Sequence, residues 1–190
     1  MTQYFLITGL PRSRTAWMAA ACSAGGSVCL HEPCAALPRW DAVFESVWHQ
    51  SELAFAGIAD HLLGFHLPEI MERAAPRTLV IDRPAAEAKA SMRRLGYDAD
   101  LFCDLLADAL RFDHPLVRRV AYSDLADSGA VRSCLQWLFP GEPVDRWRIE
   151  RMQRVNIQGD PVAASVAAGR ARGREADYLP AHVLARLRAA

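Results

Sequence analysis

The sequence predicts an α/β fold in which a parallel β-sheet lies between two layers of helices. Two observations predict it. Short apolar runs of strand length alternate with longer segments that have the spacing of amphipathic helices. The first apolar run is also rich in aromatic and branched residues, as in a buried strand. Because no internal repeat interrupts this alternation, we expect one three-layer domain over residues 1–190 with right-handed crossovers.

The first half of the chain is predicted to hold two strands and four helices. A Gly25-Gly26 pair ends the first helix, and Pro33 stands just past the second strand, where a proline stops the hydrogen-bond ladder. We expect strands over 3–8 and 27–30, and helices over 14–24, 39–49, 52–64 and 67–75.

The second half continues the alternation. Pro84 marks a helix start, because proline is favoured at the first helical position. Residues 155–176 are rich in Gly, Ala and Arg and are expected to be irregular. We expect strands over 78–81 and 117–122, and helices over 84–95, 99–111, 129–139 and 179–188.

Composition and charge narrow the function classes. The chain has 22 basic and 22 acidic residues, so its formal charge of zero argues against a nucleic-acid coat or a membrane-surface protein. Its five cysteines form no C-x-x-C pair, which indicates reduced thiols rather than a disulfide framework or a zinc site. No membrane-length apolar run or signal peptide is visible. We expect a cytoplasmic protein with a small-molecule partner and leave its oligomeric state open.

The most informative segment joins the first strand to the first helix. The apolar run Tyr4–Ile7 leads into a tight loop over residues 9–15, which carries Arg12 and Arg14. Such a loop directs backbone N–H groups and the positive end of a helix at one point. The sequence therefore predicts a binding site for a phosphate or sulfate group.

The loop departs from the P-loop of nucleotide kinases, G-x-x-x-x-G-K-[ST]. When Gly9 takes the first glycine position, Arg14, Thr15 and Ala16 occupy the last three. The lysine that holds the β- and γ-phosphates and the hydroxyl that holds Mg²⁺ are then missing. A small kinase of the same fold remains an alternative, but this loop serves metal-dependent phosphoryl transfer poorly.

The same loop resembles the 5′-phosphosulfate loop of the sulfotransferases, which often reads G-x-P-[RK]-S-G-T-T-W. The resemblance implies a P-loop-like sheet and a donor, 3′-phosphoadenosine 5′-phosphosulfate (PAPS). Arg12 would steady the leaving phosphate, and Ser13 and Thr15 would donate hydrogen bonds to it. The family often has Gly and Thr where this chain has Arg14 and Ala16. The donor-binding residues implied here are Pro11, Arg12, Ser13, Arg14, Thr15, Ala16 and Trp17.

A second motif resembles the 3′-phosphate site of the same family. There, an Arg ends a strand and a Ser follows eight residues later on the next helix, as Arg83 and Ser91 do here. The resemblance implies that both hold the 3′-phosphate of PAPS. Taken singly, Arg83 would form a surface ion pair with a neighbour such as Glu87, and Ser91 would be a solvated helix residue.

The third motif is His31-Glu32-Pro33, which follows the second strand. Ligands of open parallel sheets bind beyond the carboxyl ends of the strands, so Glu32 is expected beside the loop. Transfer to a hydroxyl needs a base, and some bacterial sulfotransferases use a Glu in a similar Glu-Pro step. We take Glu32 as the base, with His31 as the alternative. A structural ion pair between Glu32 and Arg12 or Arg14 is the competing interpretation.

Together these motifs predict a PAPS-dependent sulfotransferase that acts on a hydroxyl or amine. Glu32 and Arg12 are the expected catalytic residues, and the motifs require no metal. A catalytically silent nucleotide-binding module is an alternative from another class, since 190 residues is short for this family. The acceptor cannot be read from the sequence, because acceptor pockets are built from variable loops.

Overall fold

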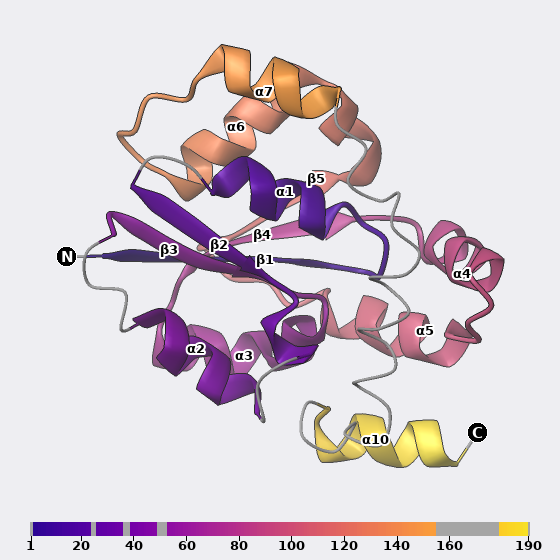
Figure 1. Cartoon of the computed structure of the whole chain (residues 1–190). Helices are drawn as coiled ribbons and strands as arrows, with labels where there is room; N and C mark the ends of the chain where they lie inside the picture. Colours follow the sequence, from indigo (N-terminus) through magenta and orange to yellow (C-terminus); the bar gives the residue numbers. More distant parts are fainter. Residues whose placement is uncertain (1, 24–25, 36–38, 49–52, 155–178, 190) are drawn as a thin grey trace.

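The structure is a computed structural model that describes residues 2–23, 26–35, 39–48, 53–154 and 179–189 (Figure 1). The segment 155–176, which the sequence predicts to be irregular, lies outside the described residues. Within the described part of the chain, no helix is both long and apolar enough to cross a membrane.

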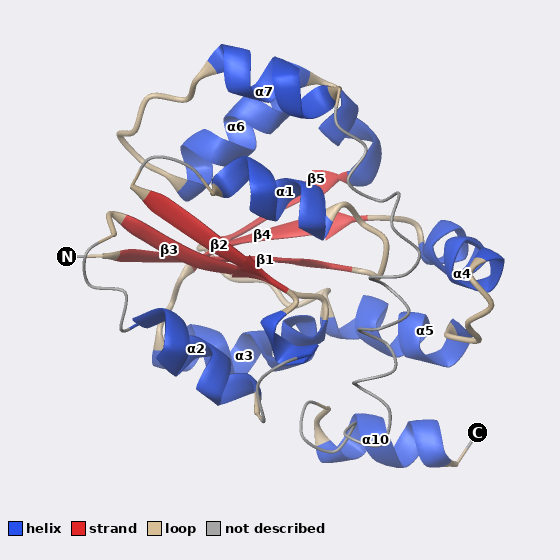
Figure 2. Cartoon of the chain, viewed as in Figure 1, coloured by secondary structure: helices blue, strands red, loops and turns tan. Residues whose placement is uncertain are grey.

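A five-stranded parallel sheet forms the centre of the molecule (Figure 2). Its strand order is β2-β3-β1-β4-β5, and each neighbouring pair is parallel. The predicted α/β fold with a P-loop-like parallel sheet is therefore confirmed. The strands are β1 (Gln3–Gly9), β2 (Ser27–His31), β3 (Phe55–Ala59), β4 (Arg77–Asp82) and β5 (Val117–Ala121).

Helices cover both faces of the sheet, as predicted (Figure 1). One face carries α1 (Thr15–Cys22), α6 (Ser128–Leu138) and α7 (Arg146–Gln153). The opposite face carries α2 (Trp40–Trp48), α3 (Leu67–Arg73), α5 (Asp100–Ala109) and α10 (Ala181–Arg188), and α4 (Ala85–Arg94) packs beside α5. Short 3₁₀ helices follow three strands: η1 (Pro33–Ala35), η2 (Leu62–His66) and η3 (Tyr122–Ala126).

Alternate side chains of the central strand, β1, pack into two hydrophobic cores on opposite faces of the sheet. In β1, Leu6 packs into the core under α2, α3 and α5, while Phe5 and Ile7 pack into the core under α1 and α6. All three are at most 2% exposed. A fully buried side chain of this size contributes about 1.5–3 kcal/mol, so burial on both faces explains why this strand reads as an unbroken apolar run.

The predicted helix over 52–64 is wrong, because this segment holds β3 and the start of η2. Its sequence, Phe-Ala-Gly-Ile-Ala, has few β-branched residues, so local propensity gives little indication of a strand. Tertiary packing decides instead: all five residues are buried between β2 and β1. Gly57 is needed there, because a Cβ atom would lie 2.3 Å from the ring of Phe5. Helix α7 has no counterpart among the predicted elements.

The topology also shows where a ligand site is expected. The chain leaves β1 on the face covered by α1, and it leaves β3 on the face covered by α3 (Figure 1). Neighbouring parallel strands whose connections diverge in this way open a crevice beyond their carboxyl ends. That edge of the sheet also holds the residues that follow β2, β4 and β5, since all five strands run in one direction.

Candidate functional site

The loop after β1 is tightly constrained. A Cβ atom at Gly9 would lie 2.6 Å from the carbonyl oxygen of Ile81 on β4, so only glycine fits. The Ser13 N–H donates to the Leu10 carbonyl at 3.2 Å and closes the turn. Arg12 and Arg14 have φ of +65° and +62°, in the left-handed region that non-glycine residues rarely adopt. Backbone strain of this kind gathers at functional sites.

Helix α1 begins directly after this loop without a side-chain cap. Its first turn therefore presents N–H groups that have no intrahelical acceptor, at the positive end of the helix. These amides belong to Thr15, Ala16 and Trp17, three of the residues that the sequence resemblance implies in donor binding. The indole of Trp17 is engaged elsewhere, because its Nε1–H donates to the Met152 carbonyl at 2.8 Å. Only the backbone of Trp17 is left for a ligand.

Two polar groups of the loop are buried without a hydrogen-bond partner among the described residues. They are the Ser13 hydroxyl, on a residue that is 0% exposed, and Nε of Arg12. A buried polar group without a partner is costly and calls for an explanation. A bound anion would accept hydrogen bonds from both groups. The residues of the loop therefore fit the phosphosulfate end of the expected donor.

Arg83 directly follows β4, and its side chain contacts the loop. Its Nη1 donates to the Arg12 carbonyl, and its guanidinium lies 4.3 Å from the ring centroid of Tyr122. The guanidinium of Arg14 lies 5.0 Å from the same centroid. Cationic groups from the ends of β1 and β4 thus converge on a residue that follows β5. An ion pair of Arg83 with Glu87, which was the alternative interpretation of Arg83 from the sequence, is present too, with Nε and Oε2 3.6 Å apart.

Ser91 does not join this cluster. It is 7% exposed on α4, so the alternative interpretation as a solvated helix residue is wrong. The described contacts of Arg83 are with Arg12, Glu87 and Tyr122 rather than with Ser91. A shared role of Arg83 and Ser91 in holding one phosphate stays a prediction.

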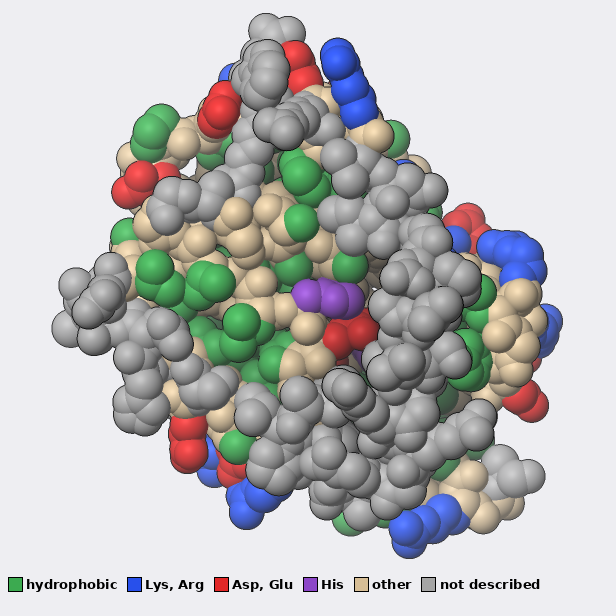
Figure 3. Space-filling view, viewed as in Figure 1, with side chains coloured by type: hydrophobic (Ala, Val, Ile, Leu, Met, Phe, Trp, Pro, Cys, Tyr) green, Lys and Arg blue, Asp and Glu red, His purple; other side chains and the backbone are tan. Residues whose placement is uncertain are grey.

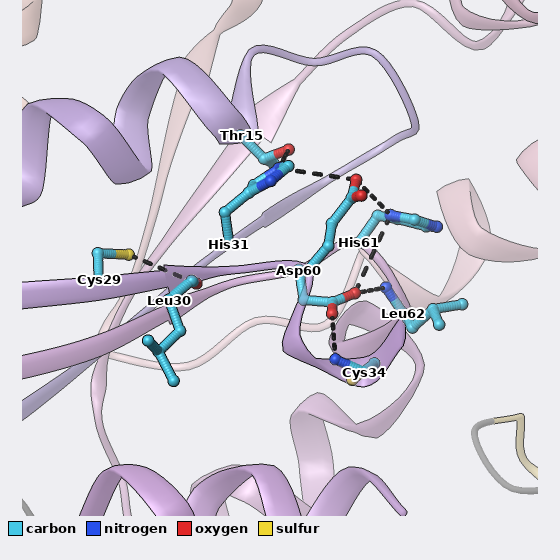
Figure 4. A network of polar contacts seen from close by, with 9 residues as sticks. Thr15, Cys29, Leu30, His31, Cys34, Asp60, His61 and Leu62 are labelled. Atoms are coloured by element: carbon cyan, nitrogen blue, oxygen red, sulfur yellow. Dashed lines mark hydrogen bonds and ion pairs between the residues drawn. The ribbon is translucent and has the colours of Figure 1, made fainter. Parts of the chain in front are cut away.

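An acidic and histidine-rich network occupies the neighbouring strand ends (Figure 4). Glu32 follows β2 with φ of +47°, and its N–H donates to the Ala59 carbonyl at 2.9 Å. Its Oε1 lies 3.6 Å from Nε2 of His31 and 3.6 Å from Nδ1 of His61. Nε2 of His31 is also 3.5 Å from Oγ1 of Thr15, which links the network to the start of α1.

Asp60 anchors this network from β3. It is 1% exposed, and its carboxylate accepts hydrogen bonds from the backbone N–H groups of Leu62 at 2.9 Å and Cys34 at 3.1 Å. Its Oδ1 lies 4.0 Å from Nδ1 of His61. Sequence reasoning missed Asp60 and His61, because both fell inside the wrongly predicted helix. An Asp-His pair directly after a short apolar run was the available signal.

Burial and charge act against each other on these groups. Burial alone would raise the pKa of Glu32, but the hydrogen bond and charge of His61, with His31 and Arg12, lower it to about 2. Burial would lower the pKa of His61, yet Glu32 and Asp60 raise it above its usual value. Glu32 is therefore a carboxylate at neutral pH, and the imidazolium form of His61 is favoured more than that of an ordinary histidine.

In the view of Figure 3, a histidine side chain and acidic side chains lie next to each other at the surface. Across the described ranges, no group of three or more His, Cys, Asp or Glu side chains has an arrangement that could hold a metal ion. Comparison with known protein families finds no family that matches this chain. No curated protein matches its sequence either.

Proposed function

We propose that this protein is a sulfotransferase that uses PAPS as donor and acts on a hydroxyl or amine acceptor. The observation that carries the proposal is the loop after β1. There the uncapped start of α1 and the buried, unpartnered groups of Arg12 and Ser13 lie together. Hydrogen-bond donors in this arrangement suit a tetrahedral anion. The loop has Thr15 and Ala16 where kinases have their Lys and the hydroxyl that holds Mg²⁺, which favours a sulfotransferase over a kinase.

A second cationic group supports a donor with two anionic ends. The guanidinium groups of Arg14 and Arg83 lie 5.0 and 4.3 Å from the ring centroid of Tyr122. Among the described residues, neither Arg12 nor Arg14 lies within ion-pair distance of a carboxylate. Arg83 has Glu87 at 3.6 Å, but the charges of Arg12 and Arg14 have no carboxylate at ion-pair distance among the described residues, and a bound dianion would offset them. The 3′-phosphate of PAPS is such a group.

In the proposed reaction, the acceptor oxygen or nitrogen forms a bond to sulfur while the bond from sulfur to the bridging phosphate oxygen breaks. Arg12 offsets the negative charge that develops on that bridging oxygen. The loop and the first turn of α1 hold the donor so that the displacement is in line.

The proton of the acceptor passes to a base beside the loop, and we assign that role to His31. A carboxylate whose pKa is about 2 is a weak base at neutral pH, which disfavours Glu32 as the acceptor of the proton. Glu32 lies 3.6 Å from His31 and would stabilise the imidazolium that forms. Glu32 as the base itself remains the competing prediction.

One observation favours a second candidate, a catalytically silent nucleotide-binding module. Glu32 is held between two histidines, and such ion pairs also occur in purely structural networks. This candidate shares the nucleotide site but lacks the transfer step, so binding and turnover together distinguish the two.

Calorimetric titration with adenosine 3′,5′-bisphosphate, ADP and ATP with Mg²⁺ tests the proposal. We expect the bisphosphate to bind most tightly, and Arg83→Ala to weaken it at least tenfold more than it weakens ADP. Arg186→Ala, on the exposed side of α10, is the matched control and should change neither affinity. Preference for ATP with Mg²⁺ would contradict the proposal and favour the kinase.

Turnover is then measured with radiolabelled PAPS and a panel of hydroxyl and amine acceptors. Label transfer that His31→Asn abolishes supports the sulfotransferase and the assigned base. Tight bisphosphate binding without transfer to any acceptor favours the silent module.

A further inference from the structure

His61 is the least exposed imidazole of the network and bridges two carboxylates. Its Nδ1 lies 3.6 Å from Oε1 of Glu32 and 4.0 Å from Oδ1 of Asp60, and its side chain is 24% exposed compared with 33% for His31. Its ring contacts Phe102 of α5 edge-on, with centroids 5.9 Å apart. The ring is thus held by an aromatic neighbour on one side and by two acids on another.

We propose that His61 is a positioning residue, which acts through Glu32 to hold its carboxylate beside His31 and the start of α1. The part of this proposal that concerns catalysis rests on the proposed function. The part that concerns the position and charge of Glu32 does not.

The backbone explains why Glu32 needs a partner of this kind. Its left-handed conformation, with φ of +47°, turns the chain sharply at the end of β2. The N–H of Glu32 is already fixed on the Ala59 carbonyl of β3, but this bond does not orient the side chain. An exposed carboxylate on a flexible side chain would sample several rotamers. The imidazolium of His61, at the end of the neighbouring strand, favours the Glu32 rotamer whose carboxylate approaches His31.

Asp60 explains why His61 can hold this position. Both carboxylate oxygens of Asp60 are occupied by backbone N–H groups, one from η1 and one from η2. Its own N–H donates to the Ile7 carbonyl of β1 at 3.0 Å. Asp60 is therefore tied to three neighbouring segments, and it places a fixed negative charge behind the imidazole of the next residue.

The charged and titratable groups around His61 come from several elements. Glu32 and His31 approach from the end of β2, Asp60 from the end of β3, Cys34 from η1 against Asp60, and Arg12 from the loop after β1. The contact from α5 is the uncharged ring of Phe102. Because the two acids outweigh burial, the pKa of His61 is raised. Its attraction for the Glu32 carboxylate is fully present below the ordinary histidine pKa of 6.5, down to the pH at which Glu32 itself gains a proton, and it is lost as the pH rises through the raised pKa of His61.

Side-chain NMR titration tests the coupling without any substrate. In the unaltered chain the Glu32 carboxyl should titrate near pH 2, and in His61→Gln its midpoint should rise by about one unit or more. His182→Gln, an exposed histidine on α10, is the matched control and should leave that midpoint unchanged. An unchanged Glu32 midpoint in folded His61→Gln would overturn the proposal.

A reciprocal measurement covers the case in which His61→Gln does not fold. Two groups that interact shift each other's protonation equally. Glu32→Gln should therefore lower the titration midpoint of the His61 ring, which needs no acidic sample. A His61 midpoint that does not move in Glu32→Gln contradicts the proposal.

Measuring the rate of sulfuryl transfer tests whether the interaction between His61 and Glu32 affects the reaction. We expect His61→Gln to lower kcat about tenfold with little change in the KM for PAPS, because His61 acts on Glu32 and not on the donor. His61→Lys keeps a positive charge to higher pH and should move the alkaline limb of the rate profile upward. An alkaline limb identical in His61→Lys and the unaltered chain would overturn the role of His61. Absence of transfer by the unaltered chain, with the NMR coupling intact, would contradict the proposed function and still support the position of Glu32.

Discussion

The two halves of the candidate site are built in different ways. The cationic half comes mainly from one continuous segment, residues 9–17, which turns from β1 into α1. The acidic half joins Glu32 and His31 after β2 to Asp60 and His61 after β3, almost thirty residues further along the chain. A continuous segment can be recognised from its own residues. A network assembled from separate strand ends becomes visible only when the strand order is known.

The first prediction tests the cationic half where it should be strongest. Arg12→Ala removes a half-buried guanidinium that, on the proposed function, offsets charge on the leaving phosphate, so we expect kcat for sulfuryl transfer to fall about 100-fold. Steady-state kinetics with labelled PAPS measure this loss. Arg186→Ala on α10 is the control. A fall smaller than tenfold would show that Arg12 does not act at the reacting group.

Gly9→Ala tests whether the loop requires its tight backbone. A new Cβ atom would lie 2.6 Å from the Ile81 carbonyl oxygen, and overpacking of this kind costs about 1–3 kcal/mol. Urea unfolding should show that loss of stability. Calorimetric titration should show weaker binding of adenosine 3′,5′-bisphosphate. Gly26→Ala, where the nearest atom would be 3.5 Å away, should change little. Equal stability of the two variants would contradict this account of the loop.

Glu32→Gln tests the acidic half through the pH dependence of stability. The pKa of Glu32 is about 2 in the folded chain and 4.5 ordinarily, so the unfolded chain binds more protons between these values. The stabilisation by Glu32 is present above about pH 4.5 and is lost as the pH falls towards 2. Because the side chain is 36% exposed, solvent screening reduces this contribution to about 1 kcal/mol.

Unfolding of both proteins in urea at several pH values measures the effect. The difference in unfolding free energy should be largest at neutral pH and should shrink in acid. A difference that stays constant down to pH 3 would assign the loss to packing rather than to the charge of Glu32.

Ser91→Ala should have the smallest effect. It tests whether Ser91 belongs to the cationic half of the site. Since Ser91 is 7% exposed on α4 and Arg83 contacts Arg12 and Tyr122 instead, we expect bisphosphate affinity to change less than about twofold. Calorimetry of Ser91→Ala beside Arg83→Ala measures it. A loss as large as that of Arg83→Ala would restore the predicted pairing of Arg83 with Ser91.

Much of the fold was predictable because the signals are local. The signals are the apolar run of β1, the Gly9 and Pro11 that follow it, and the helical spacing of α5, and each lies within a short stretch of the chain. The same holds for the loop after β1. Two elements are exceptions. Helix α7 was not predicted, and the alanines of β3 favour a helix over a strand, so Asp60 and His61 were hidden in the wrong element.

The sequence by itself determined the layered α/β architecture and predicted an anion site at the first loop, because both depend on residues that are neighbours in the chain. Tertiary structure alone decided that β3 lies between β2 and β1, and therefore that His61 meets Glu32. The physical reason is that strand pairing and burial reward contacts between distant segments. The secondary-structure propensity of a short segment does not depend on those distant contacts.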